Sequence, residues 1–588
     1  MSVKRDALVV FSPSGKRGRF APGTSVLQAA RELGVDIDSI CGGRALCGRC
    51  RVEPVAGSFA KENIVSRHQH LAPAGDAERI KLQAVGGPET SRLACMATIE
   101  GDVRIDVPAS SQVHRQVVRK DCEAHDIELD PVLRLFYVEV DPPDINIPEG
   151  DLQRLQRTLE EQWELTGLVY GVRLAREAQK TLREGKWMAT VAVRDGHEIV
   201  AIWPGFRERV YGAAIDVGST TIALHLCDLA SGETLESAGV MNPQIRFGED
   251  LMSRISYAML NDGGAAELTA AVRSAIRELL ANTVKRAGVS PDQVLEVTLV
   301  GNPVMHHMLL GFDPSPLGTA PFALATDHSV ELPASELDLG LHPGARAWLP
   351  PCIAGYVGAD TSAVLLAETP WDREEVTLII DVGTNAEIVI GNRERLLAAS
   401  SPTGPAFEGA QVSGGQRAAK GAIERVRIDP ETLEARVRVI GCDLWSDEPG
   451  FEEAVAETGV SGICGSGIIE AVAGMYLAGI VLPDGSVNGE LAGRSDLVYA
   501  DGRTFSYRLH RGDPEIVISQ GDVRAIQLAK AALHAGAQLL MDRLGVERVD
   551  RIRLAGAFGS HIDVKYAMVL GMIPDCDLGQ VSSAANAA

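Results

Sequence analysis

The chain is short of aromatic residues, of positive charge and of cysteine, and the last two shortages each exclude a class of protein. Aromatic residues make up 5% of the 588 residues, whereas the 60 glycines fit a protein with many tight turns. The 56 lysines and arginines are outnumbered by 79 acidic residues, which leaves a formal net charge of −23. Because nucleic-acid-binding proteins neutralise phosphates with basic patches, no nucleic-acid partner is expected. Ten cysteines are too few for a disulfide-stabilised scaffold.

Long apolar runs are also scarce. The stretch Ala7 to Phe11 is too short for the core of a signal peptide. The longest run, Cys464 to Leu482, contains Glu470 and four glycines, and is interpreted as a buried pair of helices rather than a membrane span. A cytoplasmic protein with no membrane partner is therefore expected. At about 150 residues per domain, the length suggests about four domains.

Four of the cysteines, Cys41, Cys47, Cys50 and Cys95, lie in the first hundred residues, whereas the other six are scattered singly. Cys41-Gly-Gly-Arg-Ala-Leu-Cys47-Gly-Arg-Cys50 places three thiols on one glycine-rich loop with x5 and x2 spacing. The plant-type pattern for a 2Fe-2S cluster is C-x4-C-x2-C…C, so the first gap here is longer by a single residue. Glycines allow backbone N–H groups to approach the sulfurs of an anionic cluster. These four cysteines are the predicted cluster ligands.

A structural zinc site is the alternative for the same cysteines. Zinc sites with four cysteine ligands usually present two short C-x2-C pairs, and this chain has only one. The surrounding sequence favours the cluster. It predicts a hairpin over Ala7–Phe11 and Arg17–Phe20, a helix over Val26–Leu33 capped by Ser25, and a strand from Arg51. This order resembles the β-grasp layout of plant- and vertebrate-type ferredoxins, and the spacing resembles their adrenodoxin-like branch.

A strand–turn–strand unit occurs twice in the later part of the chain. The first copy reads Tyr-Gly-Ala-Ala-Ile-Asp216-Val-Gly218-Ser219-Thr220-Thr221, and the second reads Leu-Ile-Ile-Asp381-Val-Gly383-Thr384-Asn385-Ala-Glu387. One such turn would be a weak signal, because hairpins often use Asp and Gly. Two copies between apolar strands indicate an internal repeat, and two merely buried hairpins are the plain alternative.

The turns have the chemistry of a phosphate site. Glycine allows backbone N–H groups to approach phosphate oxygens, hydroxyl groups donate to them, and a carboxylate faces Mg²⁺ or its waters. Two facing hairpins would hold a triphosphate from both sides. Farther along, Ile552-Arg-Leu-Ala-Gly556-Ala-Phe-Gly559 predicts a strand that leads into another glycine-rich turn, where the close backbone would accommodate adenine and ribose. ATP with Mg²⁺ is the predicted ligand.

The three turns together resemble the superfamily of actin, sugar kinases and heat-shock chaperones (ASKHA). The whole chain resembles the reductive activators of corrinoid proteins, and residues 242–250, 355–360, 404–409 and 520–530 also fit that family. The resemblance implies an α/β and α+β multidomain fold. Its parts are a β-grasp ferredoxin domain (1–110), a small α/β linker domain (111–207), and a two-lobed, actin-like and ribonuclease-H-like ATPase with halves at 208–370 and 371–588.

The resemblance also implies a role for each candidate residue. Cys41, Cys47, Cys50 and Cys95 bind the cluster, and the catalytic candidates Asp216 and Asp381 orient Mg²⁺ or the attacking water. The phosphate contacts are Gly218, Ser219, Thr220, Thr221, Gly383, Thr384 and Asn385, and the adenosine contacts are Gly556 and Gly559. Glu387, a third catalytic candidate, would orient water or point outward from its strand.

The implied function lies in corrinoid methyltransferase systems. Adventitious oxidation leaves the corrinoid cobalt as Co(II), and such an activator returns it to nucleophilic Co(I) with ATP and an external electron donor. The implied partners are that donor, a corrinoid protein or corrinoid methyltransferase, and a second copy of the chain in a homodimer. Methylamines, methoxylated aromatics, betaines and methionine synthesis are all open as methyl-donor systems.

Three other functions fit parts of the sequence. An activator of radical dehydratases or reductases also couples an ASKHA ATPase to an iron–sulfur cluster, but it typically bridges one 4Fe-4S cluster between two subunits. A small-molecule kinase with a redox-regulatory ferredoxin domain would phosphorylate a hydroxylated metabolite. A nucleotide-gated scaffold would use the ATPase as a clamp and would not need its cysteines.

Two polar stretches invite a functional interpretation. His306 and His307 are adjacent, so on a helix their side chains point about 100° apart, and core or surface histidines are expected rather than a shared metal site. The stretch Ser400-Ser401-Pro402-Thr403-Gly404 either contacts the partner or its cobalt, or is an ordinary solvated turn. In the linker, strands over 133–140 and 188–193 and helices over 151–165 and 172–183 are predicted, with no visible chemistry.

Overall fold

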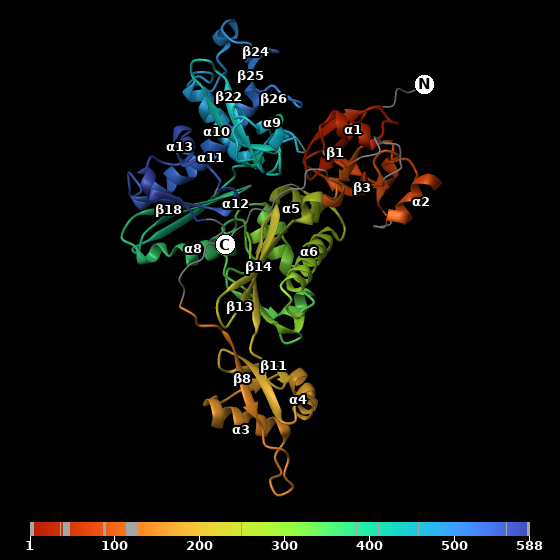
Figure 1. The fold of residues 1–588 in the computed structure, drawn as a ribbon, viewed down its shortest axis with the longest axis vertical. Coiled ribbons are helices and arrows are strands. Elements are labelled where there is room, and N and C mark those ends of the chain that lie inside the picture. The colour runs from red at the N-terminus through yellow and green to blue at the C-terminus, as the bar shows by residue number, and fades with distance from the viewer. Residues whose placement is uncertain are drawn as a thin grey trace.

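The computed structural model describes residues 5–35, 37–38, 48–85, 90–112, 128–248, 250–383, 385–409, 412–456, 458–559 and 561–584. Figure 1 shows an elongated molecule with a central unit around β13 and β14. The unit that contains β8 lies at one end, and the N-terminal unit lies on the flank. Within the described ranges, every helix is too short or too polar to span a lipid bilayer.

The N-terminal unit is a five-stranded sheet with the order β2-β1-β7-β3-β6. Its strands are β1 (Ala7–Ser12), β2 (Arg17–Phe20), β3 (Arg51–Val55), β6 (Arg92–Leu93) and β7 (Val103–Asp106), and its helices are α1 (Val26–Glu32) and α2 (Asp76–Val85). A separate hairpin pairs β4 (Gly57–Phe59) with β5 (Ile64–Ser66). Ser25 caps α1 by accepting a hydrogen bond from Gln28 N, as the sequence predicts.

The linker unit is a four-stranded sheet with two helices. The order is β8-β10-β11-β9, with β8 at Leu133–Glu139, β9 at Val169–Tyr170, β10 at Met188–Arg194 and β11 at Glu198–Pro204. The helices α3 (Asp151–Trp163) and α4 (Val172–Glu184) confirm the predicted pair. Leu174, Ala178 and Leu182 recur every four residues on α4 and are all buried, so one face of the helix packs on the sheet.

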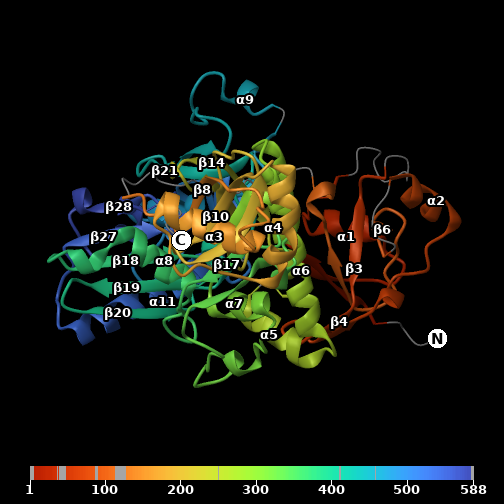
Figure 2. The same ribbon diagram turned by 90° about the horizontal axis from the view of Figure 1, so that it is seen from below.

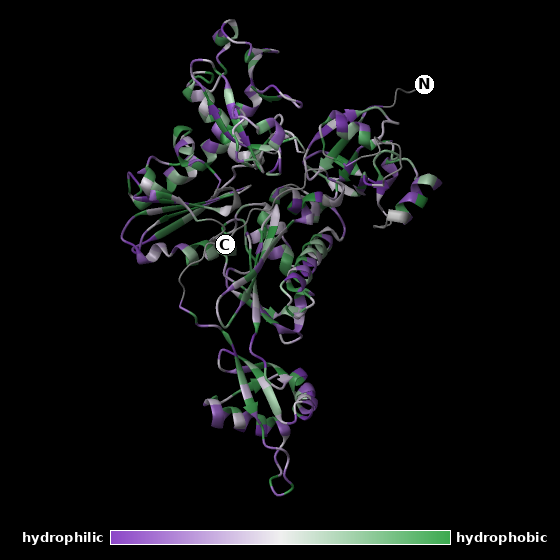
Figure 3. Ribbon diagram, viewed as in Figure 1, coloured by the Kyte–Doolittle hydropathy of each residue, from purple (hydrophilic) through white to green (hydrophobic). Residues whose placement is uncertain are grey.

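The first half of the predicted ATPase is a six-stranded sheet in the order β14-β13-β12-β15-β17-β16. Its strands are β12 (Tyr211–Val217), β13 (Thr221–Asp228), β14 (Thr234–Met241), β15 (Val294–Val300), β16 (Val330–Pro333) and β17 (Arg346–Leu349). Its helices are the short η3 (Pro243–Arg246), α5 (Leu251–Leu260), α6 (Gly264–Arg286), α7 (Pro303–Leu310) and α8 (Ala359–Glu368). Figure 3 shows hydrophilic and hydrophobic residues interspersed along α6, and the buried Leu268, Val272, Ile276 and Leu280 recur every four residues and belong to the core.

The second half repeats the central strands of the first. The order β20-β19-β18-β27-β28 is built from β18 (Thr377–Val382), β19 (Ala386–Gly391), β20 (Leu396–Ser401), β27 (Arg551–Ala555) and β28 (Val581–Ser583). In both halves the first strand pairs antiparallel with the next strand and parallel with a distant one, β15 or β27. The predicted internal repeat is therefore confirmed.

Smaller elements complete the second half. They are β21 (Ala422–Ile428), β22 (Ala435–Val439), β23 (Gly462–Ile463), β24 (Val498–Asp501), β25 (Thr504–His510), β26 (Ile516–Ile518), α9 (Phe451–Ala454), α10 (Gly465–Leu477), α11 (Gln520–Leu544), α12 (Gly556–Gly559) and α13 (Val564–Val569). The predicted helix pair over Cys464–Leu482 is wrong. Only α10 forms, because Gly479 takes a left-handed φ of 71° and Val481 then forms a β-bridge with Val487.

Candidate functional site

The cysteine site is seen through Cys50 and Cys95, since Cys41 and Cys47 lie outside the described residues. The Sγ atoms of Cys50 and Cys95 are 3.4 Å apart. Two thiolates on one tetrahedral metal ion, with metal–sulfur bonds of about 2.3 Å, are held about 3.8 Å apart. The pair therefore lies close to the spacing that a shared metal ion requires, and the donor set fits an iron–sulfur cluster.

The turn that carries Cys95 is anchored by α2. The buried Glu78 carboxylate accepts hydrogen bonds from Arg92 Nε at 2.8 Å and from the backbone N of Leu93 at 2.9 Å. The next residue, Ala94, donates its N–H to Cys50 O at 2.8 Å. These bonds fix the two cysteine-bearing segments to one another. Sequence reasoning missed Glu78, because one acidic residue in a polar helix carries no local signal.

The first phosphate hairpin, β12–β13, carries its candidate residues at the carboxyl end of β12. Asp216 is 8% exposed and lies opposite Val300 of the parallel strand β15. The turn itself consists of Gly218, Ser219 and Thr220, and Thr221 begins β13. Gly301, the residue after β15, lies close to the end of β12. A Cβ atom at Gly301 would lie 2.8 Å from Val217 O. The structure thus gathers all five predicted residues of this hairpin at one strand end.

The second phosphate hairpin, β18–β19, places Asp381 at the matching position. Asp381 lies opposite Glu387 of β19 and Ala555 of β27. Gly383 N donates to Asn385 O at 2.9 Å across the turn, and Thr384 lies outside the described residues. Gly383 has no left-handed φ, but a Cβ atom there would lie only 3.3 Å from Asn385 O. Close approach therefore favours glycine at this position.

Carboxyl groups from both halves converge beside these turns. Partial burial, together with the charges of Asp360 and Asp381, raises the pKa of Glu387 well above its ordinary value. Asp360 lies at the start of α8, and the neighbouring Ala359 N donates to Gly301 O of the first half at 3.0 Å. Mg²⁺ is usually held by one or two carboxylates together with water and phosphate oxygens. Asp360 and Asp381 fit that role, so Mg²⁺ would be held where the halves meet.

Sequence reasoning assigned no role to Asp360. A signal was present in Gly358-Ala-Asp360, because glycine and an acidic residue at a helix start indicate a close backbone approach and a carboxylate at the same place. In the structure, a Cβ atom at Gly358 would lie 2.5 Å from Gly301 O. The glycine is thus required for α8 to begin against the residue that follows β15.

Glu387→Gln is expected to raise the apparent Tm of the nucleotide-free protein at pH 8 but not at pH 5. When the pKa of a carboxyl is higher in the folded state than in the unfolded state, the free energy of unfolding falls as the pH rises from the unfolded-state pKa through the folded-state pKa. Glutamine cannot ionise, so the variant does not lose this stability. Each 1 kcal/mol recovered should shift Tm by about 2–4 °C. Scanning calorimetry at both pH values measures the effect, with the exposed Glu547→Gln as the control. An equal shift at both pH values would contradict the expectation.

The adenosine candidates Gly556 and Gly559 bound α12, directly after β27. Gly556 has a φ of 82°, and a Cβ atom there would collide with Asp381 Oδ1. Both the backbone conformation and the close contact therefore require glycine. The contact also places this turn directly against the second phosphate hairpin, as an adenosine-binding turn requires.

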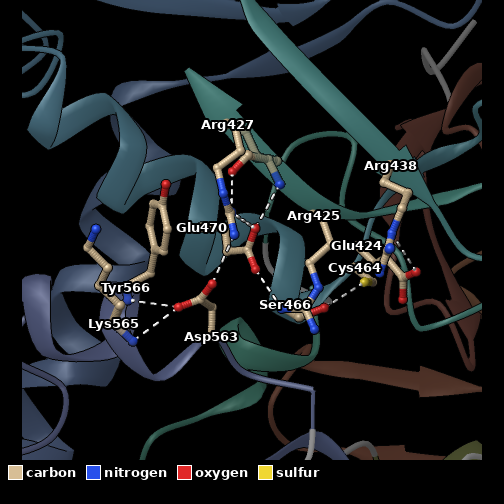
Figure 4. A network of polar contacts seen from close by, with 11 residues as sticks. Glu424, Arg425, Arg427, Arg438, Cys464, Ser466, Glu470, Asp563, Lys565 and Tyr566 are labelled. Carbon is tan, nitrogen blue, oxygen red and sulfur yellow. Dashed lines mark hydrogen bonds and ion pairs between the residues drawn. The ribbon is translucent and has the colours of Figure 1, made fainter. Parts of the chain in front are cut away.

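A buried ionic network holds the segment that follows this turn (Figure 4). Glu470 of α10 is 0% exposed and accepts hydrogen bonds from Arg425 at 2.7 Å and from Arg427 at 2.5 Å. Arg427 also donates to Asp563 at 2.9 Å, and Asp563 caps α13. Buried carboxylates need such partners, because an uncompensated buried charge is strongly destabilising. The network joins β21, α10 and α13 into one frame beside Gly556 and Gly559.

The Ser400–Gly404 stretch is not a solvated turn at its first two residues, because Ser400 and Ser401 end β20. Ser400 Oγ donates to Glu387 Oε1 at 3.2 Å, and the buried Ser401 donates to Ala532 O at 2.7 Å. Thr403 Oγ1 donates to Gly383 O at 3.3 Å. The stretch is thus tied to the second phosphate hairpin, and its contact with a partner stays a prediction.

The two adjacent histidines lie in the core. Both side chains of α7 are buried, and burial lowers the pKa of His306 to about 4. His307 Nδ1 contacts Pro303 O at 2.7 Å, and its Nε2 accepts a hydrogen bond from Ala325 N at 3.0 Å. Since His307 uses both ring nitrogens within the protein, it is a structural residue, as expected.

Four protein families match successive parts of the chain. The 2Fe-2S iron-sulfur cluster binding domain matches residues 11–100, and the RACo linker region matches residues 122–209. The RACo middle region matches residues 211–369, and the C-terminal domain of RACo, the ASKHA domain, matches residues 375–588.

One relative and one solved structure match nearly the whole chain, and a second relative matches about three fifths of it. The corrinoid activation enzyme RamQ of Eubacterium limosum is 28% identical over 577 residues, which are 96% of this chain and 88% of the relative. The Co(II) methylated amine-specific corrinoid protein reductase of Methanosarcina barkeri is 25% identical over 404 residues, 62% of this chain and 66% of the relative. A solved structure of a reductive activator for corrinoid, iron-sulfur protein is 30% identical with a TM-score of 0.69, and the match covers 99% of this chain and 91% of that one. The chain belongs to the RACo family of reductive activators of corrinoid proteins, with a ferredoxin-type domain at one end and an ASKHA domain at the other.

Proposed function

We propose that the protein uses ATP, in the cytoplasm, to deliver one electron through its 2Fe-2S cluster to the Co(II) form of a corrinoid protein or corrinoid methyltransferase. One observation carries this proposal: a pair of cysteine sulfurs at metal spacing and two Asp-bearing hairpins, each at the end of a matching parallel strand pair, occur in a single chain. The printed names of the relatives, which concern corrinoid activation and reduction of a Co(II) corrinoid protein, support the substrate class.

The electron balance is simple. One electron enters from an external donor at the cysteine site and leaves to Co(II), which becomes Co(I), while ATP and water give ADP and phosphate in a separate reaction. For a one-electron transfer, about 59 mV corresponds to a tenfold change in the equilibrium constant. Closure of the two halves around ATP would offset an unfavourable step of that kind or make delivery one-way. Asp381, together with Asp360, would hold Mg²⁺, and Asp216 would orient Mg²⁺ or the attacking water during hydrolysis.

The proposal predicts that Co(I) forms only when ATP is present. The purified protein is mixed with a chemical reductant and a Co(II) corrinoid protein, and the Co(I) absorbance is followed with ATP, with ADP and without nucleotide. Formation is expected with ATP alone, because ADP lacks the phosphate that both hairpins would contact. Equal formation in all three mixtures would contradict the ATP requirement. Consumption of ATP that depends on a sugar or acid would instead indicate a kinase.

A further inference from the structure

Residues 242–248, Asn-Pro-Gln-Ile-Arg-Phe-Gly, connect β14 to α5 and contain η3; we name them the bridging segment. No role in the cluster or the nucleotide site accounts for them. Yet Asn242 and Gln244 are both 0% exposed, and Asn242 caps η3 by accepting a hydrogen bond from Gln244 N at 3.0 Å. Buried amides of this kind fix the backbone around them, because each donor and acceptor left without a partner is costly.

One side of the bridging segment holds the first phosphate turn. Asn242 Nδ2 donates to Gly218 O at 2.9 Å. The guanidinium of Arg254, which is 0% exposed, donates to Ser219 O and also to Gly248 O at 2.9 Å. Two successive carbonyl groups of the turn are therefore held from the same side.

These bonds orient the other side of the turn. In a planar trans peptide the C=O and the adjoining N–H point in opposite directions. With the carbonyls of Gly218 and Ser219 held toward Asn242 and Arg254, the N–H groups of Ser219 and Thr220 are directed away from the bridging segment. N–H groups aimed together in this way form an anion-binding surface. Asn242 and Arg254 are thus positioning residues for the phosphate turn.

The other side of the bridging segment holds the ferredoxin domain. Arg104 of β7, which is 1% exposed, donates to Ile245 O at 3.1 Å and to Glu62 Oε1 at 3.1 Å. The Arg104 guanidinium also stacks 5.0 Å from the centroid of the Phe59 ring. A buried cation held by a carbonyl of another domain is a specific contact, because the geometry must satisfy its donors.

A hairpin of the ferredoxin domain reinforces this contact. Figure 2 shows β4 beside α5, where Ser58 N donates to Asn261 Oδ1 at 2.8 Å and Asn261 Nδ2 donates to Ser58 O at 3.2 Å. The Phe59 ring packs 5.6 Å from the Tyr257 ring, and Lys61 pairs with Asp250 at 2.5 Å. The β4–β5 hairpin is therefore docked on the same helix that supplies Arg254.

The contact is also continuous with the cysteine site. Strand β3 begins directly after Cys50, and its last residue, Val55, lies opposite Arg104 of β7. Five residues of strand span about 17 Å. Strand β3 thus leads from a predicted cluster ligand to Val55, the cross-strand neighbour of the residue that donates to Ile245 O.

We propose that the bridging segment couples nucleotide binding to docking of the ferredoxin domain. The inference rests on the proposed function, since it requires ATP at the first phosphate turn. Arg104 fixes the position of Ile245, and the bridging segment in turn fixes the position of Asn242. Asn242 then holds the turn so that its N–H groups are directed toward the phosphate site. Coupling free energies are reciprocal, so ATP that tightens the turn must tighten ferredoxin docking by the same factor.

Arg104→Met tests the coupling from the ferredoxin side, where no nucleotide contact is predicted. The affinity for a non-hydrolysable ATP analogue should fall about fivefold, the lower end of typical coupling. Arg194→Met is the matched control, because Arg194 bonds Glu296 at 3.2 Å and so joins the linker to the same ATPase half without touching the bridging segment. The analogue affinity of this control should be unchanged. Titration calorimetry measures both, and the cluster spectrum reports folding of the ferredoxin domain.

Hydrogen exchange tests the same coupling from the nucleotide side. The analogue should slow exchange in residues 57–66, the β4–β5 hairpin, of the unaltered protein but not of Asn242→Ser, which keeps a capping oxygen and loses the donor to Gly218. If Arg104→Met does not fold, adding Glu62→Gln removes the carboxylate left without its cation. Failure of the unaltered protein to bind the analogue would overturn the proposed function and this inference together. Normal binding with equal or tighter affinity in Arg104→Met, or with no slowing of exchange in residues 57–66, would overturn this inference alone.

Discussion

Replacing Cys95 with serine is expected to abolish Co(II) reduction and to leave nucleotide binding unchanged. Cys95 Sγ lies 3.4 Å from Cys50 Sγ, so the substitution removes one of two adjacent thiolates from the cluster site. Even the loss of an outer partner of a metal ligand typically costs about 10–100-fold in metal affinity or activity, so at least a 100-fold fall is expected here. The visible absorption and the spin-resonance signal of the reduced protein should disappear with the activity.

Cys227→Ser is the matched control for this experiment. Cys227 lies in β13, far along the chain from the ferredoxin domain, with its Sγ 3.7 Å from Thr234 Oγ1, so a hydroxyl in its place keeps a polar neighbour. This variant should retain the cluster spectrum and the activity. Full activity of Cys95→Ser would contradict the cysteine assignment. A four-iron signal from the unaltered protein would contradict the 2Fe-2S assignment, and bound zinc without visible absorption would support the zinc alternative.

Asp381→Asn is expected to lower ATP hydrolysis at least about 100-fold, the usual loss when one preorganised polar group of a catalytic site is removed. Asparagine keeps the shape of the side chain at the end of β18, next to Glu387 and Gly556, but lacks the charge that would face Mg²⁺. Released phosphate and single-turnover Co(I) formation should fall together. The cluster spectrum should not change, because the substitution leaves the ferredoxin domain untouched.

The exposed Asp372→Asn controls for a general loss of charge in the same half. Asp216→Ala tests the first phosphate hairpin, and the proposed coupling predicts that this variant also loses ATP-dependent Co(I) formation. Unchanged Co(I) formation in Asp216→Ala would contradict the coupling. Unchanged hydrolysis in Asp381→Asn would show that the repeated Asp has a structural role only.

The parts of the fold that depend on neighbouring residues could be predicted from the sequence. The Asp-x-Gly turns lie between apolar strands, Ser25 caps α1, and the linker helices show their period-four apolar faces. Each of these signals arises within a window of about 10–18 residues, the range over which periodicity and capping act.

The parts that depend on distant residues could not be predicted. Asp360 gains its significance from Asp381 and Glu387, to which it is brought only when α8 meets the second half. Likewise, Glu470 is the single charged residue of an apolar run in the sequence. No neighbouring residue indicated that Arg425 and Arg427 would pair with it. The Ser400-Ser401 pair had the composition of a turn, but pairing with β19 overrides that preference. Tertiary contacts decide all three cases.

The parallel pairing of β18 with β27 also sets an order of events during synthesis. The residues that directly precede these two strands are also joined, because Val376 N donates to Asp550 Oδ2 across 174 residues of chain. During synthesis, β18 cannot pair with β27 until the chain has been made as far as β27. Contacts between residues so distant in the sequence form slowly. The β-grasp sheet is complete once β7, which pairs with β1, has been made, and N-terminal domains generally fold first during synthesis. The ferredoxin-type domain can therefore fold while the ASKHA domain is still incomplete on the ribosome.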